Sequence, residues 1–275
     1  MSKTFFHPAS FARLETFITD APQSLLISGP SGVGLTTAAE YFGTQLGALV
    51  QTILPEKDEK VDLEKGVISV DSVRKIYGMA KTIETGRRVI VIDYAERMGT
   101  QAQNAFLKLL EEPGVNTHFI LLTHELSKLL PTIRSRTQHL EMRPVSLEQS
   151  NEILDQLKVL DPQKRSQLLF IATGLPAELT RLSTNDKAFD SRVQVVRDAR
   201  QFLQGSPYDR LVVAQSYKDN REKTLLLLGD AMKMIEKNIS EGKSELLPEL
   251  DKLLKTYERI EANGNIRLQL AASMV

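Results

Sequence analysis

The stretch SLLISGPSGVGLTTAAEYFGTQLG, residues 24–47, decides the fold. It begins with a short apolar run, continues through a glycine-rich loop and ends in a segment that is typical of a helix. A strand that leads through such a loop into a helix is the setting of a phosphate-binding loop, in which backbone N–H groups at the helix start face an anion. The stretch therefore predicts an α/β domain built around this loop.

The loop departs from the usual pattern G-x-x-x-x-G-K-[ST] at one position. Gly29 opens the loop, Gly34 closes it, and Thr36 stands where the metal-coordinating hydroxyl belongs. Leu35 occupies the lysine position, so the loop lacks the cation that contacts the β- and γ-phosphates. We expect Gly29, Gly32, Gly34 and Thr36 to form a degenerate nucleotide site, with weak binding of ATP and magnesium or none.

A second departure lies in VIVIDYAERM, residues 89–98. An apolar strand that ends in Asp93 is a Walker B pattern, whose aspartate helps to hold magnesium. In active ATPases of this kind a glutamate usually follows and activates the attacking water. Here Tyr94 follows, and a phenol with a pKa of about 10 is a poor general base at neutral pH. Glu96 lies two residues further on and is not an equivalent replacement.

Short apolar runs alternate with helical segments in the first half of the chain. Continuous apolar strands that alternate with helices predict a parallel sheet covered on both faces. Residues 54–66, between two of these runs, are predicted to form a polar loop. The predicted strands are 24–28, 48–53, 87–93, 118–123 and 137–142.

Pro144 ends this alternation, and everything after it has helical spacing. The sequence predicts three parts: an α/β domain over 1–143, a small helical domain over 144–186 and a helical bundle over 187–275. The polar residues 183–190 are the predicted linker between the two helical parts.

Composition excludes several classes of protein. The chain has 35 basic and 35 acidic residues, which argues against a strong chain-wide attraction to nucleic acid or to an anionic membrane. It has no cysteine, which excludes disulfides, zinc–cysteine sites and thiol catalysis. The four histidines lack metal-ligand spacing, so no metal site is predicted. Without a long apolar run or the apolar core of a secretion signal, we expect a cytoplasmic protein and no membrane partner.

The stretch NAFLKLLEEPGVNTHFILLTHELSKLLPTIRSRTQHLEMRPVS, residues 104–146, resembles the clamp-loader branch of the AAA+ ATPases. It is especially similar to the gamma/tau and delta-prime subunits of bacterial DNA polymerase III. A weaker similarity extends to ANGNIRLQL, residues 262–270. The resemblance implies an AAA+ sheet domain, a helical lid and an all-α collar that joins neighbouring subunits in a ring.

The resemblance also assigns roles to individual residues. Thr123 matches the sensor 1 position, and SRT at 135–137 matches the family's Ser-Arg-Cys motif. The arginine of that motif, here Arg136, reaches into the ATP site of a neighbouring subunit. Active members carry a lid arginine near the position of Glu178, where a glutamate would repel a γ-phosphate, although Arg181 is close by.

The helix after the Walker B strand carries Lys108, Glu111 and Glu112. The resemblance implies that this region faces the central chamber of the ring and approaches DNA. A solvent-facing cluster of charges spaced three and four residues apart is an alternative interpretation.

These features together predict a non-hydrolysing subunit of the delta-prime type. It would need no cofactor of its own, complete the clamp-loader ring and supply Arg136 as an arginine finger to an adjacent ATPase. The implied partners are gamma/tau-like and delta-like subunits and, through the complex, the sliding clamp and primed DNA. Two alternatives stay open: an active gamma-type ATPase with unusual site residues, and an inactive AAA+ adaptor that acts outside replication.

Overall fold

The computed structural model describes residues 5–63, 65–81 and 86–274. The chain divides into two compact units, Met1–Arg181 and Leu182–Val275. The first unit holds a sheet with its covering helices, and the second unit is helical. The three-part division predicted from the sequence, with boundaries after residues 143 and 186, remains a prediction.

The first unit is built on a parallel sheet of five strands in the order β2-β5-β6-β1-β7. Each strand lies within one residue of its predicted bounds, so the predicted α/β class and its strands are confirmed. The strands are β1 (Ser24–Ser28), β2 (Leu49–Ile53), β5 (Arg88–Ile92), β6 (Thr117–Thr123) and β7 (Gln138–Glu141).

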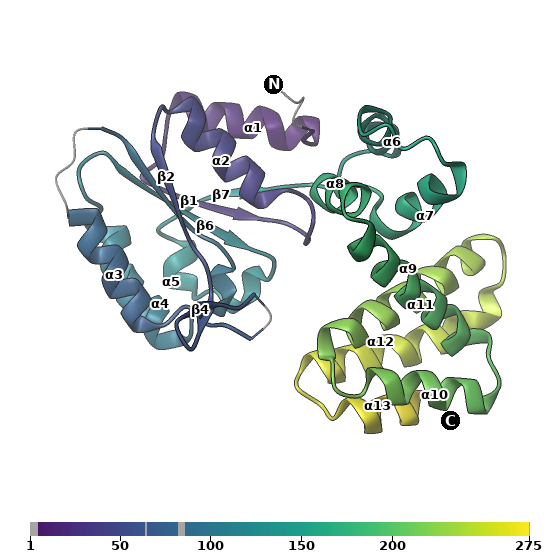
Figure 1. Ribbon diagram of the computed structural model, residues 1–275. Helices are drawn as coiled ribbons and strands as arrows, with labels where there is room; N and C mark the ends of the chain where they lie inside the picture. The colour runs from purple at the N-terminus through teal and green to yellow at the C-terminus, as the bar shows by residue number, and fades with distance from the viewer. Residues whose placement is uncertain (1–4, 64, 82–85, 275) are drawn as a thin grey trace. The chain divides into compact units, whose positions relative to one another are not determined.

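Helices cover both faces of this sheet, as the apolar strands predict. One face is covered by α1 (Pro8–Thr19) and α2 (Leu35–Gln45). The other face is covered by α3 (Val70–Lys81), α4 (Thr100–Glu111) and α5 (Pro131–Arg134) (Figure 1). The sequence predicts a helix over residues 71–82, which α3 confirms as far as Lys81, and residue 82 lies outside the described residues.

Successive residues of the central strand point to opposite faces. Leu25 and Ile27 pack into the core that contains Phe42 of α2, whereas Leu26 packs with Phe106 of α4. All four apolar core residues named here on β1 and α2 are nearly inaccessible to solvent. A strand that is buried on both faces must be apolar throughout, which explains the continuous apolar runs in the sequence.

The prediction of a polar loop at residues 54–66 is wrong. This segment forms a two-stranded antiparallel hairpin, β3 (Glu56–Lys57) and β4 (Lys60–Val61). Asp58 and Glu59 both have positive φ, which is the geometry of a tight two-residue hairpin turn. The polar composition concealed the hairpin, because its strands are two residues long and have no apolar alternation.

Three helices follow the last strand: α6 (Leu147–Gln156), α7 (Pro162–Ala172) and α8 (Pro176–Thr184). Ser146 and Gln149 form a capping box that fixes the start of α6. The break predicted at Pro144 is therefore observed as the change from sheet to helices.

The second unit is a helical bundle with its own core. Asn185 separates α8 from α9 and caps α9 through its side chain, so the predicted linker over 183–190 is wrong. Most of that polar stretch is helical, because its charges lie on exposed faces. The helices are α9 (Asp186–Gln204), α10 (Pro207–Tyr217), α11 (Arg221–Ser240), α12 (Leu247–Glu261) and α13 (Ile266–Met274).

A buried ion pair joins two helices of this bundle. Arg192 on α9 donates two hydrogen bonds to the carboxylate of Asp230 on α11. The side chain of Arg192 is 9% exposed and that of Asp230 is 1% exposed. Because both charges are buried and satisfied by each other, removing either one leaves the other without compensation.

Candidate functional site

The predicted nucleotide-site residues meet at the carboxyl ends of three neighbouring strands. The glycine loop follows β1, Asp93 follows β5, and Thr123 ends β6. The carboxyl edge of a parallel sheet is where open α/β folds bind ligands. The structure therefore brings Gly29, Thr36, Asp93 and Thr123 to one place, which the separate motifs alone could not establish.

The glycine loop has the backbone that the motif requires. Gly34 has a φ of 101° and precedes α2 directly, a conformation that favours glycine. A Cβ on Gly29 would lie 2.6 Å from the carbonyl oxygen of Met142, so this position also requires glycine. Leu35, by contrast, is 4% exposed and packs into the apolar core. The residue at the lysine position thus serves packing and offers no charge to a ligand.

The two magnesium-type ligands of the motif contact each other. The Thr36 hydroxyl donates a hydrogen bond to Oδ2 of Asp93 at 3.3 Å, and the Tyr94 backbone N–H donates to Oδ1 at 2.9 Å. Burial raises the pKa of the Asp93 carboxyl above its ordinary value, although these two hydrogen bonds act in the opposite direction. The Thr36 hydroxyl and the Asp93 carboxyl group thus lie together, as the two oxygen groups that could ligate magnesium.

Tyr94, at the position of the catalytic glutamate, is packed rather than poised for catalysis. Its backbone is left-handed, with a φ of 54°. Its ring meets the ring of His124 edge to face, with centroids 5.5 Å apart, and the guanidinium of Arg97 lies 5.7 Å from its centroid. Glu96 lies near the same loop: its Oε1 accepts a hydrogen bond from the His124 backbone N–H at 3.4 Å, and its Oε2 is buried without a hydrogen-bond partner among the described residues.

Thr123 and His124 tie the end of β6 to the start of the glycine loop. The fully buried Thr123 hydroxyl accepts a hydrogen bond from the Glu125 backbone N–H at 3.1 Å. The Thr123 carbonyl accepts from the Gly29 N–H at 3.3 Å, and His124 Nδ1 lies 2.9 Å from the Gly29 carbonyl oxygen. A carbonyl only accepts, so His124 carries a proton on Nδ1. No sequence pattern indicated this role for His124.

The other side of the loop is held by helix α8. The Gly32 carbonyl accepts hydrogen bonds from the backbone N–H groups of Ala177 and Glu178, at 2.9 and 3.2 Å. A Cβ on Gly32 would lie 2.7 Å from the Cβ of Glu178. The Glu178 carboxylate forms a bidentate pair with Arg181 at 2.7 Å. The loop therefore caps the first turn of α8, and Arg181 is engaged by Glu178.

This set of residues does not fit a tightly held magnesium triphosphate. The corner of Thr36 and Asp93 could ligate magnesium, but Leu35 provides no charge for the β- and γ-phosphates. The carboxylate of Glu178 is paired with Arg181, so neither side chain provides a free cation for the phosphates, and the Gly32 carbonyl is directed to α8. Phosphate binding at such a loop relies on a cation beside the backbone N–H groups, and Leu35 does not supply one.

Arg136 lies on the surface and is paired with a carboxylate. Ser135 separates it from the end of α5. Its Nε donates a hydrogen bond to Oε1 of Glu111 at 3.0 Å, and its Nη2 lies 2.8 Å from the same oxygen in the ion pair. Its Nη1 donates to the Thr132 carbonyl at 3.3 Å. The side chain of Arg136 is 40% exposed and that of Glu111 is 51% exposed. The sequence did not reveal this pair, because its members are 25 residues apart and on different elements.

Arg136 lies at the opposite end of the sheet from the glycine loop. Gln138 at the start of β7 pairs in register with Leu25 of the parallel strand β1. Arg136 is two residues before Gln138, so in this register it corresponds to position 23 of the chain. That position is six residues before Gly29. At about 3.3 Å per residue, the two are separated by roughly 20 Å along the strands. Arg136 does not reach the nucleotide-type site of its own chain.

One more polar contact lies at the end of β1. The Ser28 hydroxyl is 2.7 Å from Nε2 of His139 on the edge strand β7. Burial lowers the pKa of His139 below its ordinary value, and the nearby Glu141 acts in the opposite direction. His139 therefore favours its neutral form in the folded chain.

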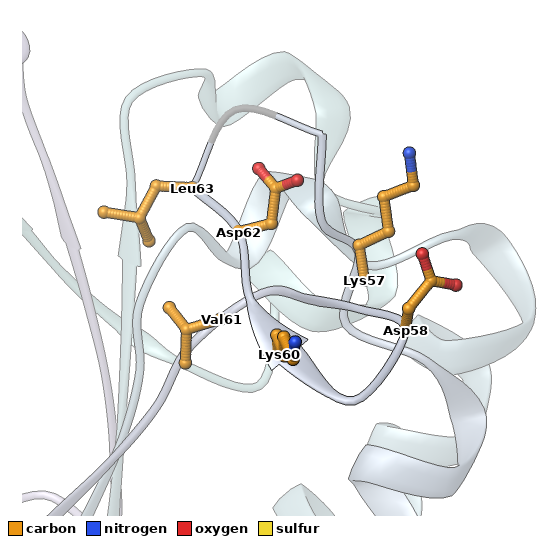
Figure 2. A pocket seen from close by; sticks show the side chains of 6 residues that line it. All are labelled: Lys57, Asp58, Lys60, Val61, Asp62 and Leu63. Carbon is orange, nitrogen blue, oxygen red and sulfur yellow. The ribbon is translucent and has the colours of Figure 1, made fainter.

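An open hollow of about 560 Å³ lies at the β3–β4 hairpin, and none of its lining residues belongs to these motifs. Lys57, Asp58, Lys60 and Asp62 line it with Val61 and Leu63 (Figure 2). Its lining mixes charges of both signs and has no nucleophile–base pair, so it suggests no catalytic chemistry. Among the described residues, no group of three or more histidine, aspartate or glutamate side chains is arranged to hold a metal.

Comparisons with known proteins agree with the resemblance seen in the sequence. Residues 50–146 match the family described as "DNA polymerase III, delta subunit". This match contains Asp93, Thr123 and Arg136 but not the glycine loop. Within the described residues, no helix is both long enough and apolar enough to cross a bilayer.

Two curated relatives are delta-prime subunits of DNA polymerase III. The one from Pseudomonas aeruginosa is 31% identical over 205 residues, which is 65% of this chain and 60% of that protein. The one from Bacillus subtilis is 35% identical over 116 residues, which is 42% of this chain and 34% of that protein. The matched region thus spans less than two thirds of the length of either relative.

A solved structure extends the comparison to the whole fold. A DNA polymerase III gamma subunit-related protein from Thermotoga maritima has a TM-score of 0.53 and 21% identity, over 95% of this chain and 97% of that one. At this identity the likeness shows the fold alone. Together with the delta-prime relatives, it confirms the resemblance and the fold class: the chain is similar to delta-prime clamp-loader subunits and has the AAA+ architecture.

Proposed function

We propose that this protein is a non-hydrolysing clamp-loader subunit of the delta-prime type that supplies Arg136 to the ATP site of a neighbouring subunit. In this role it completes a ring with gamma/tau-like and delta-like subunits and acts in loading a sliding clamp onto primed DNA. The helices from α9 to α13 form the collar that joins it to the ring. The protein is cytoplasmic and requires no nucleotide of its own.

The observation that carries this proposal is the placement of Arg136. It is exposed, and it lies roughly 20 Å along the strands from the glycine loop of its own chain. A guanidinium is always charged and binds phosphate oxygens in a fork, so an exposed arginine at this position suits a phosphate on another chain. The role as a finger itself comes from the Ser-Arg-Thr motif at 135–137.

The state of the nucleotide-type cleft supports the non-hydrolysing part of the proposal. Leu35 is buried in the core and Tyr94 is packed between His124 and Arg97. Glu178 faces the loop where active members carry an arginine. Three departures in one cleft argue against turnover, whereas the retained contact between Thr36 and Asp93 is the observation that favours an active gamma-type enzyme.

The test has two parts. First, the purified chain is titrated with ATP and magnesium in a calorimeter and assayed for turnover, and we expect neither binding at micromolar concentrations nor hydrolysis. Second, the chain is mixed with gamma/tau-like and delta-like subunits and analysed by size exclusion, and we expect a complex. Turnover that is lost with Thr36→Ala would establish the gamma-type alternative. Failure to form a complex would favour the adaptor outside replication.

A further inference from the structure

We propose that Glu111 is the positioning residue for Arg136: it holds one edge of the guanidinium so that the other edge is presented to a phosphate of the neighbouring subunit. This inference rests on the proposed function. It assigns to the end of α4 a role that neither the motif at 135–137 nor the charge pattern of that helix indicated.

The contacts of Arg136 define the two edges. A guanidinium has five N–H groups. Nε–H donates a hydrogen bond to Oε1 of Glu111, Nη2 lies 2.8 Å from the same oxygen in the ion pair, and one Nη1–H donates to the carbonyl of Thr132. Within the described part of the chain, each terminal nitrogen keeps at least one N–H that donates no hydrogen bond. Those two groups form the fork that a phosphate accepts in a bidentate contact.

The elements that carry these residues are fixed in different ways. Glu111 is the last residue of α4, whose buried face packs through Phe106, Leu109 and Leu110. Arg136 follows the short helix α5, and its backbone N–H donates to the carbonyl of Ile133 at 3.1 Å. The long arginine side chain itself is exposed and would otherwise sample many rotamers. The pair with Glu111 therefore adds orientation where the backbone alone does not.

The solvent exposure of the Arg136–Glu111 pair indicates that the pair orients a side chain rather than stabilises the fold. With 40% and 51% of the two side chains exposed, the pair adds little to the free energy of unfolding. Without Glu111, the side chain of Arg136 would lose its rotamer freedom only when it binds the phosphate, and this entropic cost is the expected effect of Glu111 on activity. That cost corresponds to a rate effect of about 2- to 10-fold, much smaller than the effect of the arginine itself.

The test is a double-mutant cycle in the reconstituted clamp-loader ring. ATPase rates are measured for the unaltered chain, Glu111→Ala, Arg136→Ala and the double variant, with Glu112→Ala as the neighbouring control and size exclusion to verify assembly. We expect Glu111→Ala to lower kcat by about 2- to 10-fold at unchanged KM for ATP. In the Arg136→Ala background we expect no further effect. Glu111→Gln, which keeps an acceptor, should recover part of the loss, and Glu112→Ala should have none.

Several outcomes would overturn the proposal. An unchanged rate, a rate that rises, a loss that persists in the Arg136→Ala background, or failure of both Glu111 variants to enter the ring would each exclude positioning. If Arg136→Ala lowers the rate and Glu111→Ala does not, only this inference fails. If Arg136→Ala itself has no effect, the proposed function fails with it.

Discussion

Two arginine–carboxylate pairs in this molecule have the same chemistry and opposite surroundings. Arg192 and Asp230 are 9% and 1% exposed and bind each other between two helices of the second unit. Arg136 and Glu111 are 40% and 51% exposed at the end of the sheet in the first unit. If either member of the buried pair loses its partner, an uncompensated charge remains in the protein interior. The exposed pair can bind a third group from outside, because water solvates its charges.

The glycine loop belongs with the buried pair in this comparison. Its polar groups contact other groups of the same chain: Gly32 binds α8, Gly29 binds Thr123 and His124, and Thr36 binds Asp93. These contacts fix the backbone of the loop, and the buried Leu35 leaves the loop without the cation of the motif. The comparison indicates that a sequence motif alone does not identify the site at which a chain binds another group. The accessibility of the charged side chains is also needed.

The largest predicted effect is on the free energy of unfolding, which should respond very differently when each of the two pairs is broken. Asp230→Ala leaves Arg192 buried without a counter-charge, and we expect it to lower the free energy of unfolding by about 3–5 kcal/mol. Glu111→Ala should change it by no more than about 1 kcal/mol. Urea unfolding followed by circular dichroism measures both. Similar losses in the two variants would remove the distinction on which the comparison rests.

The next effect concerns the contact between the glycine loop and α8. Gly32 has a φ of +83°, and an added Cβ would lie 2.7 Å from Glu178 Cβ, so Gly32→Ala should cost about 1–3 kcal/mol. Gly78 in α3 has open space around it, so Gly78→Ala is the matched control and should stabilise by about 0.4–1 kcal/mol. Thermal melts of the two variants should shift in opposite directions. A neutral Gly32→Ala would mean that α8 does not hold the loop in solution.

The smallest effect is a pH dependence at the edge of the sheet. The folded-state pKa of His139 lies below its unfolded-state value of 6.5, so the unfolded chain binds more protons once the pH falls below about 6.5. Stability is therefore full above that pH and is lost as the pH falls toward the lower folded-state pKa. Because the ring is partly exposed and Glu141 and Arg13 act on it in opposite directions, the loss is small.

The measurement for His139 is urea unfolding at pH 7.5 and pH 5.5. His139→Gln should lose less stability between these two values than the unaltered chain. An equal loss in His139→Gln would show that another group causes the pH dependence.

The sequence predicted the sheet well because each of its strands is buried on both faces, as Leu25, Leu26 and Ile27 illustrate. It failed at residues 54–66 and 183–190, where short strands and exposed helix faces have the polar composition of loops. In both places the backbone is held by hydrogen bonds and capping, which composition does not report.

For the candidate site as well, the sequence predicted some features and missed others. The motifs singled out Gly29, Thr36, Asp93, Thr123 and Arg136, and the structure brings the first four to one edge of the sheet, while their roles stay predictions. The contacts of Gly32 with α8, of His124 with Gly29 and of Arg136 with Glu111 join residues that are far apart in the sequence. No spacing rule connects such residues, so these contacts could only be found in the structure.

The most direct test of the central claim is the ATPase rate of the reconstituted clamp-loader ring with Arg136→Ala in this chain. The matched control is Arg134→Ala, at the last residue of α5 and two residues before Arg136. If Arg136 acts in trans, turnover at the receiving site should fall by about 10³-fold or more, since that is the effect of an arginine finger, while the control ring keeps its rate. An unchanged rate in an assembled Arg136→Ala ring would contradict the account.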